Sequence, residues 1–297
     1  MLRKFKTEDL LGELSRRISE KEEMQLQIDQ LSTQLNELNK KLSDSEALKS
    51  HFISNISNEL VNPFTSVLAL TENILEVEKE NWKKVVSMVS LIHKEVFNLD
   101  FQLKNIFAAA KLEAGEISPG ITLINIDNLI ENVINSFKYD ARRQHVEIKY
   151  SSENKTANST IFFKSDAEKI HQIICNLVSN AIKFSYSEGN ILIRAIKENN
   201  LLTLSVQDFG QGISKANEQI IFDRFKRLDD GINSINRGHG LGLSIIKSNI
   251  DLLEGKIKFK SDLGKGTTFT ITIAESDIET TGVSNDVDEL FFKQEKF

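Results

Sequence analysis

Three polar side chains recur at helical spacing in residues 176–184, in the C-terminal half of the chain. Asn176 and Asn180 are four residues apart, which places them on one face of a helix. Amide oxygens there suit Mg²⁺, a hard cation that keeps several waters and shares substrate phosphates. Lys183 adds a cation for those phosphates. The spacing therefore predicts a helix that faces a phosphate-bearing ligand.

Three glycine-containing segments follow, at residues 208–212, 238–244 and 264–269. The first opens with Asp208 directly after an expected strand, where a carboxylate can accept a hydrogen bond from an adenine amino group. The second opens a helix, whose free N–H groups suit a phosphate. The third leads into the last strand through Thr267. The glycines of these segments are Gly210, Gly212, Gly238, Gly240, Gly242, Gly264 and Gly266.

In this order, the four segments resemble the N, G1, G2 and G3 boxes of the ATP-binding fold shared by histidine kinases, gyrase, Hsp90 and MutL proteins. Residues 221–227 also resemble the histidine-kinase F box, which the other three branches lack. The resemblance covers roughly residues 50–274. It implies an α/β-sandwich (Bergerat-type) domain that binds ATP with Mg²⁺.

The resemblance also implies a role for single residues. It implies that Asn180 holds Mg²⁺, that Asp208 reads adenine and that residues 226–240 form a mobile lid. Arg227 is expected to contact the phosphates, and Thr267 to support the adenine pocket. The cofactor-binding set is Asn176, Asn180, Lys183, Asp208, Gly210, Gly212, Arg227, Gly238, Gly240, Gly242 and Thr267.

The residue at position 176 distinguishes the ATP-hydrolysing branches of this fold from the kinase branch. The hydrolysing members carry a glutamate four residues before the Mg²⁺ asparagine, where it acts as a general base for water. An asparagine cannot take a proton near neutral pH. The site is therefore expected to hold ATP without cutting it quickly, which favours the kinase branch.

An upstream motif, residues 50–66, resembles the phosphoacceptor box of sensor histidine kinases. Asn58 stands where the family has its acceptor histidine, and Val61 where it has a basic residue. An amide nitrogen is a very poor nucleophile because its lone pair is delocalised. Asn58 is therefore not expected to be phosphorylated. The positions that match the family pattern are Phe52, Ser57, Glu59, Leu60 and Pro63.

A second function of the box is retained in its spacing. In the family, Glu-x-x-Thr/Asn after the acceptor positions the water that dephosphorylates the partner response regulator, and Glu59 and Asn62 keep that spacing. Three other histidines are not favoured as replacement acceptors. His51 lies two turns earlier without an adjacent carboxylate, while His93 and His239 are expected to be structural or nucleotide-adjacent.

The elements that must position these motifs begin with a long helix. Apolar residues on alternating steps of four and three give a heptad seam, whose period of 3.5 predicts a left-handed coiled coil, most simply a parallel dimer. A single amphipathic helix packed on the body of the protein is the alternative. The seam residues are Leu10, Leu14, Met24, Ile28, Leu31, Leu35, Leu38 and Leu42, continued by Phe52 and Ile56.

This helix is expected to extend to about Glu76, bent at Pro63. After a polar turn at residues 78–81, an apolar stripe from Val85 to Phe107 predicts a second helix. Two antiparallel helices cannot bury both stripes alone, so a four-helix bundle across a homodimer is expected.

Beyond Pro119 the pattern predicts mixed strands and helices. Helices are expected at residues 127–139 and 166–183, and strands at residues 145–150, 160–163, 190–197, 201–207, 256–260 and 267–273. The acidic tail after about Glu275 is read as largely disordered. The predicted fold class is α+β, with divisions at residues 1–45 (coiled coil), 46–116 (helical hairpin), 117–276 (ATP-binding domain) and 277–297 (tail).

The composition of the chain limits the partners and the cellular compartment that can be expected. The net charge of −6 gives no general reason to expect nucleic acid or an anionic membrane surface. One cysteine, Cys175, excludes an intramolecular disulfide and fits a reducing compartment and a core position. No apolar run is long enough to span a bilayer, and no secretory signal begins the chain, so a cytoplasmic protein is expected.

Three functions remain open at this point. The first is a two-component histidine-kinase homologue that binds ATP·Mg²⁺, engages a response regulator and acts as a phosphatase or pseudokinase, or phosphorylates a histidine-bearing partner in a heterodimer. The second is an active histidine kinase whose acceptor was replaced by design. The third is a binding scaffold that responds to ATP.

Overall fold

A computed structural model describes residues 7–78, 81–114, 119–155, 159–223, 240–278 and 283–284. Side chains at residues 7–10, 41, 44–45, 47–59, 112–114 and 283–284 lie outside this description. The chain divides into two compact units, Met1–Asn55 and Ile56–Phe297. Both contain part of the first helix, and the candidate site lies wholly in the second.

Helix α1 (Thr7–Leu75) is continuous, with Pro63 inside it. The prediction that the heptad segment and the acceptor-type box form one helix is therefore confirmed. The described seam side chains are exposed on this helix, namely Leu14, Met24, Ile28, Leu31, Leu35, Leu38 and Leu42. Their pairing in a coiled coil stays a prediction.

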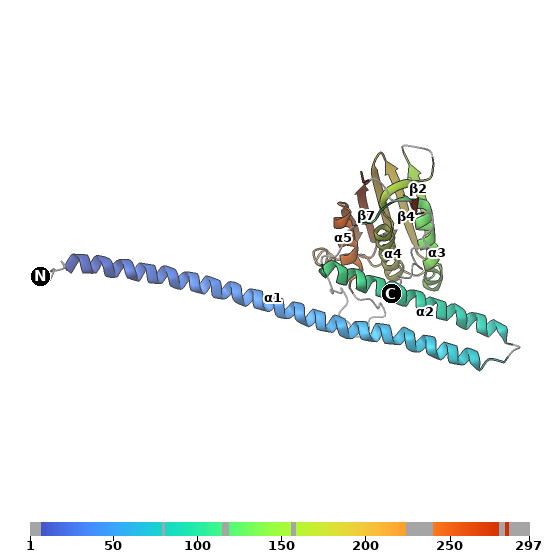
Figure 1. Ribbon diagram of the computed structural model, residues 1–297, viewed down its shortest axis with the longest axis horizontal. Helices are drawn as coiled ribbons and strands as arrows, with labels where there is room; N and C mark the ends of the chain where they lie inside the picture. Colours follow the sequence, from blue (N-terminus) through green and yellow to red (C-terminus); the bar gives the residue numbers. More distant parts are fainter. Residues whose placement is uncertain are drawn as a thin grey trace. The chain divides into compact units, whose positions relative to one another are not determined.

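Helix α2 (Trp82–Ala114) follows a short turn and runs antiparallel to the end of α1 (Figure 1). Of its predicted apolar stripe, Leu99 is buried, whereas Val89, Val96 and Phe107 are exposed. Phe97 and Phe101, which lie outside that stripe, pack against the core of the following domain. The large apolar side chains that stay exposed on α2 are Trp82, Val86, Val89, Leu91, Val96 and Phe107. That exposed set is the surface on which the predicted dimer bundle would depend.

A five-stranded mixed sheet forms the second half of the chain, in the order β2-β4-β5-β7-β6. Its strands are β2 (Glu147–Asn154), β4 (Asn190–Glu198), β5 (Leu201–Asp208), β7 (Gly266–Ala274) and β6 (Lys256–Asp262). Within this sheet β2 and β4 are parallel neighbours, and the other pairs are antiparallel.

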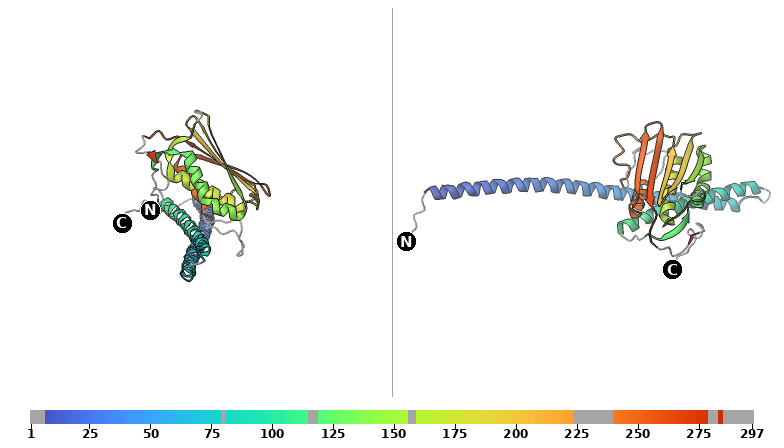
Figure 2. Two further views of the ribbon diagram at one scale, coloured as in Figure 1. Left: turned by 90° about the vertical axis from the view of Figure 1, so that its right-hand side faces the viewer. Right: turned by 90° about the horizontal axis from the view of Figure 1, so that it is seen from above.

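Three helices lie against one face of this sheet: α3 (Ile126–Gln144), α4 (Ala167–Phe184) and α5 (Gly242–Leu252) (Figure 2). Alternate strand residues such as Ile191, Ile193 and Ala195 point into the resulting core and are almost fully buried. Helix α4 lies between α3 and α5, so apolar residues are buried around most of its circumference. Cys175 is one of them, as predicted, and burial raises the pKa of its thiol.

A small second sheet was not predicted. It has the order β3-β1-β8, with β1 (Ile121–Asn125) antiparallel to β3 (Phe162–Asp166) and parallel to β8 (Val283–Ser284). Asp166 at the end of β3 caps α4 by accepting from the N–H of Lys169 at 2.9 Å. The remaining tail residues, 285–297, lie outside the described residues, so their predicted disorder stays a prediction.

One strand begins later than its sequence pattern suggested. His145 has a left-handed backbone (φ 56°), and its N–H closes the end of α3 on the carbonyl oxygens of Ala141 and Arg142. It therefore belongs to the helix cap, and β2 starts at Glu147. Among the helices of the described residues, none is long and apolar enough to cross a membrane.

Candidate functional site

The three polar residues on α4 have different surroundings. Asn176 is 3% exposed and its side chain is hydrogen-bonded to protein groups. Asn180, one turn later, is only partly buried and lines a cavity. Lys183 lines the same cavity, with Nζ 5.1 Å from the centre of the Phe184 ring. All three residues line the cavity, and Asn176 differs from the other two because its side chain is already hydrogen-bonded to Asn105 and to the Gln172 carbonyl.

Asp208 lies at the end of β5 and is held by backbone donors. Its Oδ1 accepts from the N–H of Gly210 at 3.0 Å and from the N–H of Thr267 at 3.2 Å. Among the described residues Oδ2 has no hydrogen-bond partner. Burial raises the pKa of the Asp208 carboxyl above its ordinary value, and these two N–H groups oppose that rise. One carboxylate oxygen is thus fixed, and the other is available to a hydrogen-bond donor.

The glycines of the G1 and G3 segments allow backbone segments to pack directly on one another. A Cβ at Gly210 would overlap the carbonyl of Phe184, and one at Gly266 would overlap the carbonyl of Asp208. Gly212 meets the Asp262 carbonyl in the same way and has φ +67°. These three glycines allow the end of α4, the loop after β5 and the β6–β7 hairpin to stack.

Thr267 belongs to a small polar cluster beneath Asp208. Its hydroxyl lies 2.8 Å from that of Ser261, and Ser261 accepts from the N–H of Ile213 at 2.7 Å. Thr267 is 5% exposed and also lines the cavity. Backbone and side chain of this residue together fix the loop that carries Asp208.

The G2 segment ends at the start of α5. Gly240 lines the cavity, and α5 begins at Gly242 without a side-chain cap. Gly242 packs on the α4 amides, since a Cβ there would lie 2.9 Å from Oδ1 of Asn176 and 3.7 Å from Nδ2 of Asn180. Uncapped N–H groups at a helix start favour an anion such as a phosphate.

A cavity of about 610 Å³ joins these elements. Asn180, Lys183, Asp208, Gly212 and Thr267 all line it, so the structure brings together most of the predicted cofactor-binding residues. Asn62 and Pro63 of α1 line it as well, with residues of α2 that sequence reasoning did not select. These α2 residues are Lys94, Glu95, Asn98, Phe101, Gln102 and Asn105.

Side chains of α2 fix it against the α/β sandwich. Phe97 and Phe101 meet the Phe137 ring edge-on, with centroids 5.6 and 5.9 Å away. Lys94 is 9% exposed, and its Nζ lies 3.7 Å from Oδ1 of Asp140. Lys94 lies outside the apolar stripe predicted for α2, so the sequence pattern did not indicate this contact.

Several predicted residues cannot be placed at the site. Arg227, Gly238 and His239 lie outside the described residues. Asn58 and Glu59 lie in α1, as does His51, but their side chains are not among those described. His93 is exposed on α2, away from the cavity.

The chemistry of the cavity fits an adenine nucleotide. Oδ2 of Asp208 can accept from an amino group, while Lys183 and the start of α5 can meet phosphates. The described residues contain no group of three or more His, Cys, Asp or Glu side chains that could hold a metal ion. A Mg²⁺ ion here would therefore take Asn180 as its protein ligand and complete its coordination with phosphates and water.

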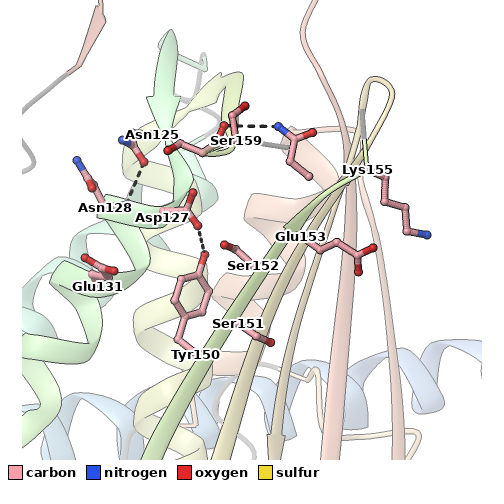
Figure 3. Close-up of a pocket in the computed structure, with 12 residues that line it drawn as sticks. Asn125, Asp127, Asn128, Glu131, Tyr150, Ser151, Ser152, Glu153, Lys155 and Ser159 are labelled. Atoms are coloured by element: carbon pink, nitrogen blue, oxygen red, sulfur yellow. Dashed lines mark hydrogen bonds between the residues drawn. The ribbon is translucent and has the colours of Figure 1, made fainter. Parts of the chain in front are cut away.

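A second, polar cavity of about 870 Å³ lies at the other end of α3, and Figure 3 shows its lining. Asp127 accepts there from the hydroxyl of Tyr150 at 2.7 Å and from the N–H of Ile161 at 2.9 Å. Burial and this carboxylate raise the pKa of the Tyr150 phenol. No predicted site residue lines this cavity. The contacts of the Asp127 carboxylate join α3 to β2 through Tyr150 and to the backbone of Ile161.

Comparison with known proteins agrees with this description. A family model for the "Histidine kinase-, DNA gyrase B-, and HSP90-like ATPase" matches residues 165–277. The circadian input-output histidine kinase CikA of Synechococcus elongatus is 28% identical over 78% of this chain and 30% of its own length. CikA of Thermosynechococcus vestitus is 30% identical over 84% of this chain and 35% of its own length. The chain thus spans about a third of the length of these curated relatives.

A solved structure of similar fold is full-length ShkA in complex with AMPPNP. The match has a TM-score of 0.53 and 23% identity, and covers 75% of this chain and 46% of ShkA. At that identity the likeness shows the fold alone.

Proposed function

Because the chain belongs to the sensor histidine kinase family and carries a GHKL-type ATP-binding domain, we propose that it binds ATP with Mg²⁺ in the cavity beside α4 and engages a response-regulator receiver domain. The observation that carries the nucleotide part is Asp208. Two backbone N–H groups hold its Oδ1, which leaves Oδ2 for the adenine amino group. The AMPPNP complex of ShkA supports a nucleotide in this fold.

Each lining residue then has a role. Asp208 selects adenine, Thr267 and Ser261 hold the loop that carries it, and the start of α5 with Lys183 meets the phosphates. Asn180 supplies a ligand to Mg²⁺, which neutralises phosphate charge when it is bound. Asn176 offers no base for water, so slow hydrolysis is expected.

The residue at the acceptor position, Asn58, determines whether bound ATP can phosphorylate this chain. Asn58 lacks a nucleophilic lone pair, so the chain as written does not phosphorylate itself. Glu59 and Asn62 keep the spacing of the family's phosphatase pair, and Asn62 lines the same cavity as Asn180. We therefore favour dephosphorylation of a response regulator, by a homodimer, as the net activity. Phosphorylation of a histidine-bearing partner in a heterodimer is the next alternative.

Two further alternatives stay distinguishable. If the acceptor was replaced by design, restoring histidine at position 58 would restore an efficient kinase. If the domain is only a scaffold that responds to ATP, nucleotide would bind without any change in a phosphorylated receiver domain.

Calorimetric titration of the full chain with ATP and Mg²⁺ tests the nucleotide site. Asn180→Ala is expected to remove the Mg²⁺-dependent part of the affinity, and Asp208→Ala the preference for ATP over GTP. Asn132→Ala on the exposed surface of α3 is the matched control and should bind as the unaltered chain does. Unchanged binding in both site variants would show that the nucleotide is held elsewhere.

A further inference from the structure

Asn176 forms a reciprocal amide pair with Asn105 of α2. Nδ2 of Asn105 donates to Oδ1 of Asn176 at 3.1 Å, and Nδ2 of Asn176 donates to Oδ1 of Asn105 at 3.0 Å. Asn105 is 7% exposed and Asn176 3%. The two residues are 71 positions apart, and neither the N-box pattern nor the α2 stripe indicates their contact.

This pair and the Gln172 carbonyl occupy both hydrogens of the Asn176 amide and one of the two acceptor sites of its oxygen. The second hydrogen on Nδ2 is donated to the carbonyl of Gln172 at 2.9 Å. Oδ1 also faces Gly242, where even a methyl group would come within 2.9 Å of it. Asn176 lines the cavity, so a Mg²⁺ ion or its water that binds Oδ1 has to compete with the hydrogen bond from Asn105.

A chain of amides extends the contact to the helix that follows the G2 segment. Nδ2 of Asn249 in α5 donates to Oε1 of Gln172 at 2.8 Å, and Nε2 of Gln172 donates to the carbonyl of Lys104 at 3.4 Å. Asn249 is itself buried. Helices α5, α4 and α2 are thus joined through side chains that can exchange partners.

The chemistry of an amide pair suits such an exchange. Each amide gives up water and gains a neutral partner of similar strength, so the pair contributes little net free energy. A hydrated cation can therefore replace Asn105 at Oδ1 of Asn176 with little loss where water takes over the other half of the pair. An apolar pair in the same place would have nothing to offer a nucleotide.

We propose that Asn105 controls access of ATP·Mg²⁺ to Asn176: the α2 contact and the nucleotide-bound cation compete for one amide. This inference rests on the proposed nucleotide site. It makes Asn105, which lies outside every motif, a positioning residue that acts through Asn176. By linkage, bound ATP·Mg²⁺ must weaken the hold of α2 on α4 by the same factor as α2 weakens the nucleotide.

Calorimetric titration of the full chain with ATP, once in Mg²⁺ and once in EDTA, tests whether Asn105 and the cation compete for Asn176. Asn105→Ala should raise the affinity for ATP·Mg²⁺ about five- to tenfold and leave the affinity in EDTA unchanged. Asn105→Leu keeps the volume of the side chain and should do the same, which guards against a folding defect in the alanine variant. Asn132→Ala, an exposed amide on α3, should change neither value.

Hydrogen exchange supplies the reciprocal measurement. ATP·Mg²⁺ should speed amide exchange in α2 around Asn105 in the unaltered chain, and have a much smaller effect in Asn105→Leu. Equal or weaker ATP·Mg²⁺ binding in both Asn105 variants would overturn the competition while leaving the nucleotide site intact. Absence of ATP·Mg²⁺ binding in all variants would overturn the proposed function and this inference with it.

Discussion

Asp208 combines a structural and a recognition role in one carboxylate. Its Oδ1 holds the backbone of Gly210 and Thr267, while its burial makes the ionised form unfavourable in the folded chain. A carboxyl whose pKa is raised by folding binds its proton more tightly in the native state. The contribution of Asp208 to stability is therefore fully present below the unfolded pKa of about 3.8 and is lost as pH rises through the folded pKa.

Asp208→Asn separates these two roles. The amide oxygen can still accept both backbone N–H groups, and the charge is gone, so the fall in stability above pH 3.8 should be reduced. Affinity for ATP should drop at least about tenfold, because the amide N–H₂ would face another donor on adenine. Thermal unfolding at about pH 4 and about pH 8 measures the change in stability, and an ATP titration at the higher pH measures the affinity. Tight ATP binding by this variant would contradict the role of Oδ2.

Asn62 tests the phosphatase part of the proposal. Asn62→Ala should lower the rate at which the chain dephosphorylates a receiver domain by about tenfold or more, because the attacking water loses an orienting group. The substrate is a receiver domain that has been phosphorylated with labelled acetyl phosphate. The measurement is the loss of label from this domain over time. Thr65→Ala, one turn away and exposed, serves as the control. Equal rates in both variants would remove Asn62 from the activity.

At the scale of elements, the β6–β7 hairpin shows why one glycine is essential and its neighbour is not. Gly264 and Gly266 both have positive φ, of +79° and +101°. A Cβ at Gly264 meets open space, whereas one at Gly266 overlaps the Asp208 carbonyl. Within this one turn, a side chain at Gly264 would therefore bring backbone strain alone, whereas a side chain at Gly266 would bring both strain and a steric clash.

Gly266→Ala should destabilise the fold by about 3 kcal/mol or more, since both strain and overlap act on it. Gly264→Ala has strain alone and should cost about 1 kcal/mol. Urea unfolding of the two variants gives the comparison. Similar losses would indicate that the stacking of the hairpin on the loop after β5 adjusts easily, and would weaken the case that Gly266 is needed for that stacking.

The elements differ in how far sequence could predict them. Helices α1, α2 and α4 have long apolar periodicities, so their existence follows from local pattern. Strands β1 and β8 are short, and β8 exists through pairing with a strand far earlier in the chain. The resemblance of the N and G segments to the boxes of a known ATP-binding fold indicated most of the predicted residues that line the cavity. The Asn105–Asn176 pair could not be found in this way, because a contact between distant amides leaves no periodic signal.

At the scale of the whole molecule, the exposed apolar side chains argue for a second copy. The α1 seam and the outer face of α2 would expose large apolar surfaces in a monomer, and each buried Leu or Val is worth about 1.5–3 kcal/mol. Light scattering at micromolar concentration should therefore give a dimer. Deleting residues 1–45 should weaken the dimer without dissociating it, because the α2 face remains. A monomeric full-length chain would contradict the bundle.

Autophosphorylation also belongs to the whole molecule, because it would need the nucleotide domain and the acceptor helix together. The chain as written should carry no acid-labile, base-stable phosphate after incubation with γ-labelled ATP, since Asn58 offers no imidazole. Asn58→His places a nucleophile between Ser57 and Glu59 in α1, with Glu59 beside it to take its proton. We expect slow gain of label, because Val61 replaces the usual basic residue.

Two controls make this result decisive. Asn58→His combined with Asn180→Ala should lose the label, which ties it to the Mg²⁺-dependent site. Label on His51 in the unaltered chain would show that the acceptor chemistry has moved two turns along α1. If Asn58→His binds ATP tightly and still carries no label, the nucleotide cannot be delivered to position 58. The chain would then act as a scaffold that responds to ATP, because the loss of transfer would extend beyond one missing imidazole.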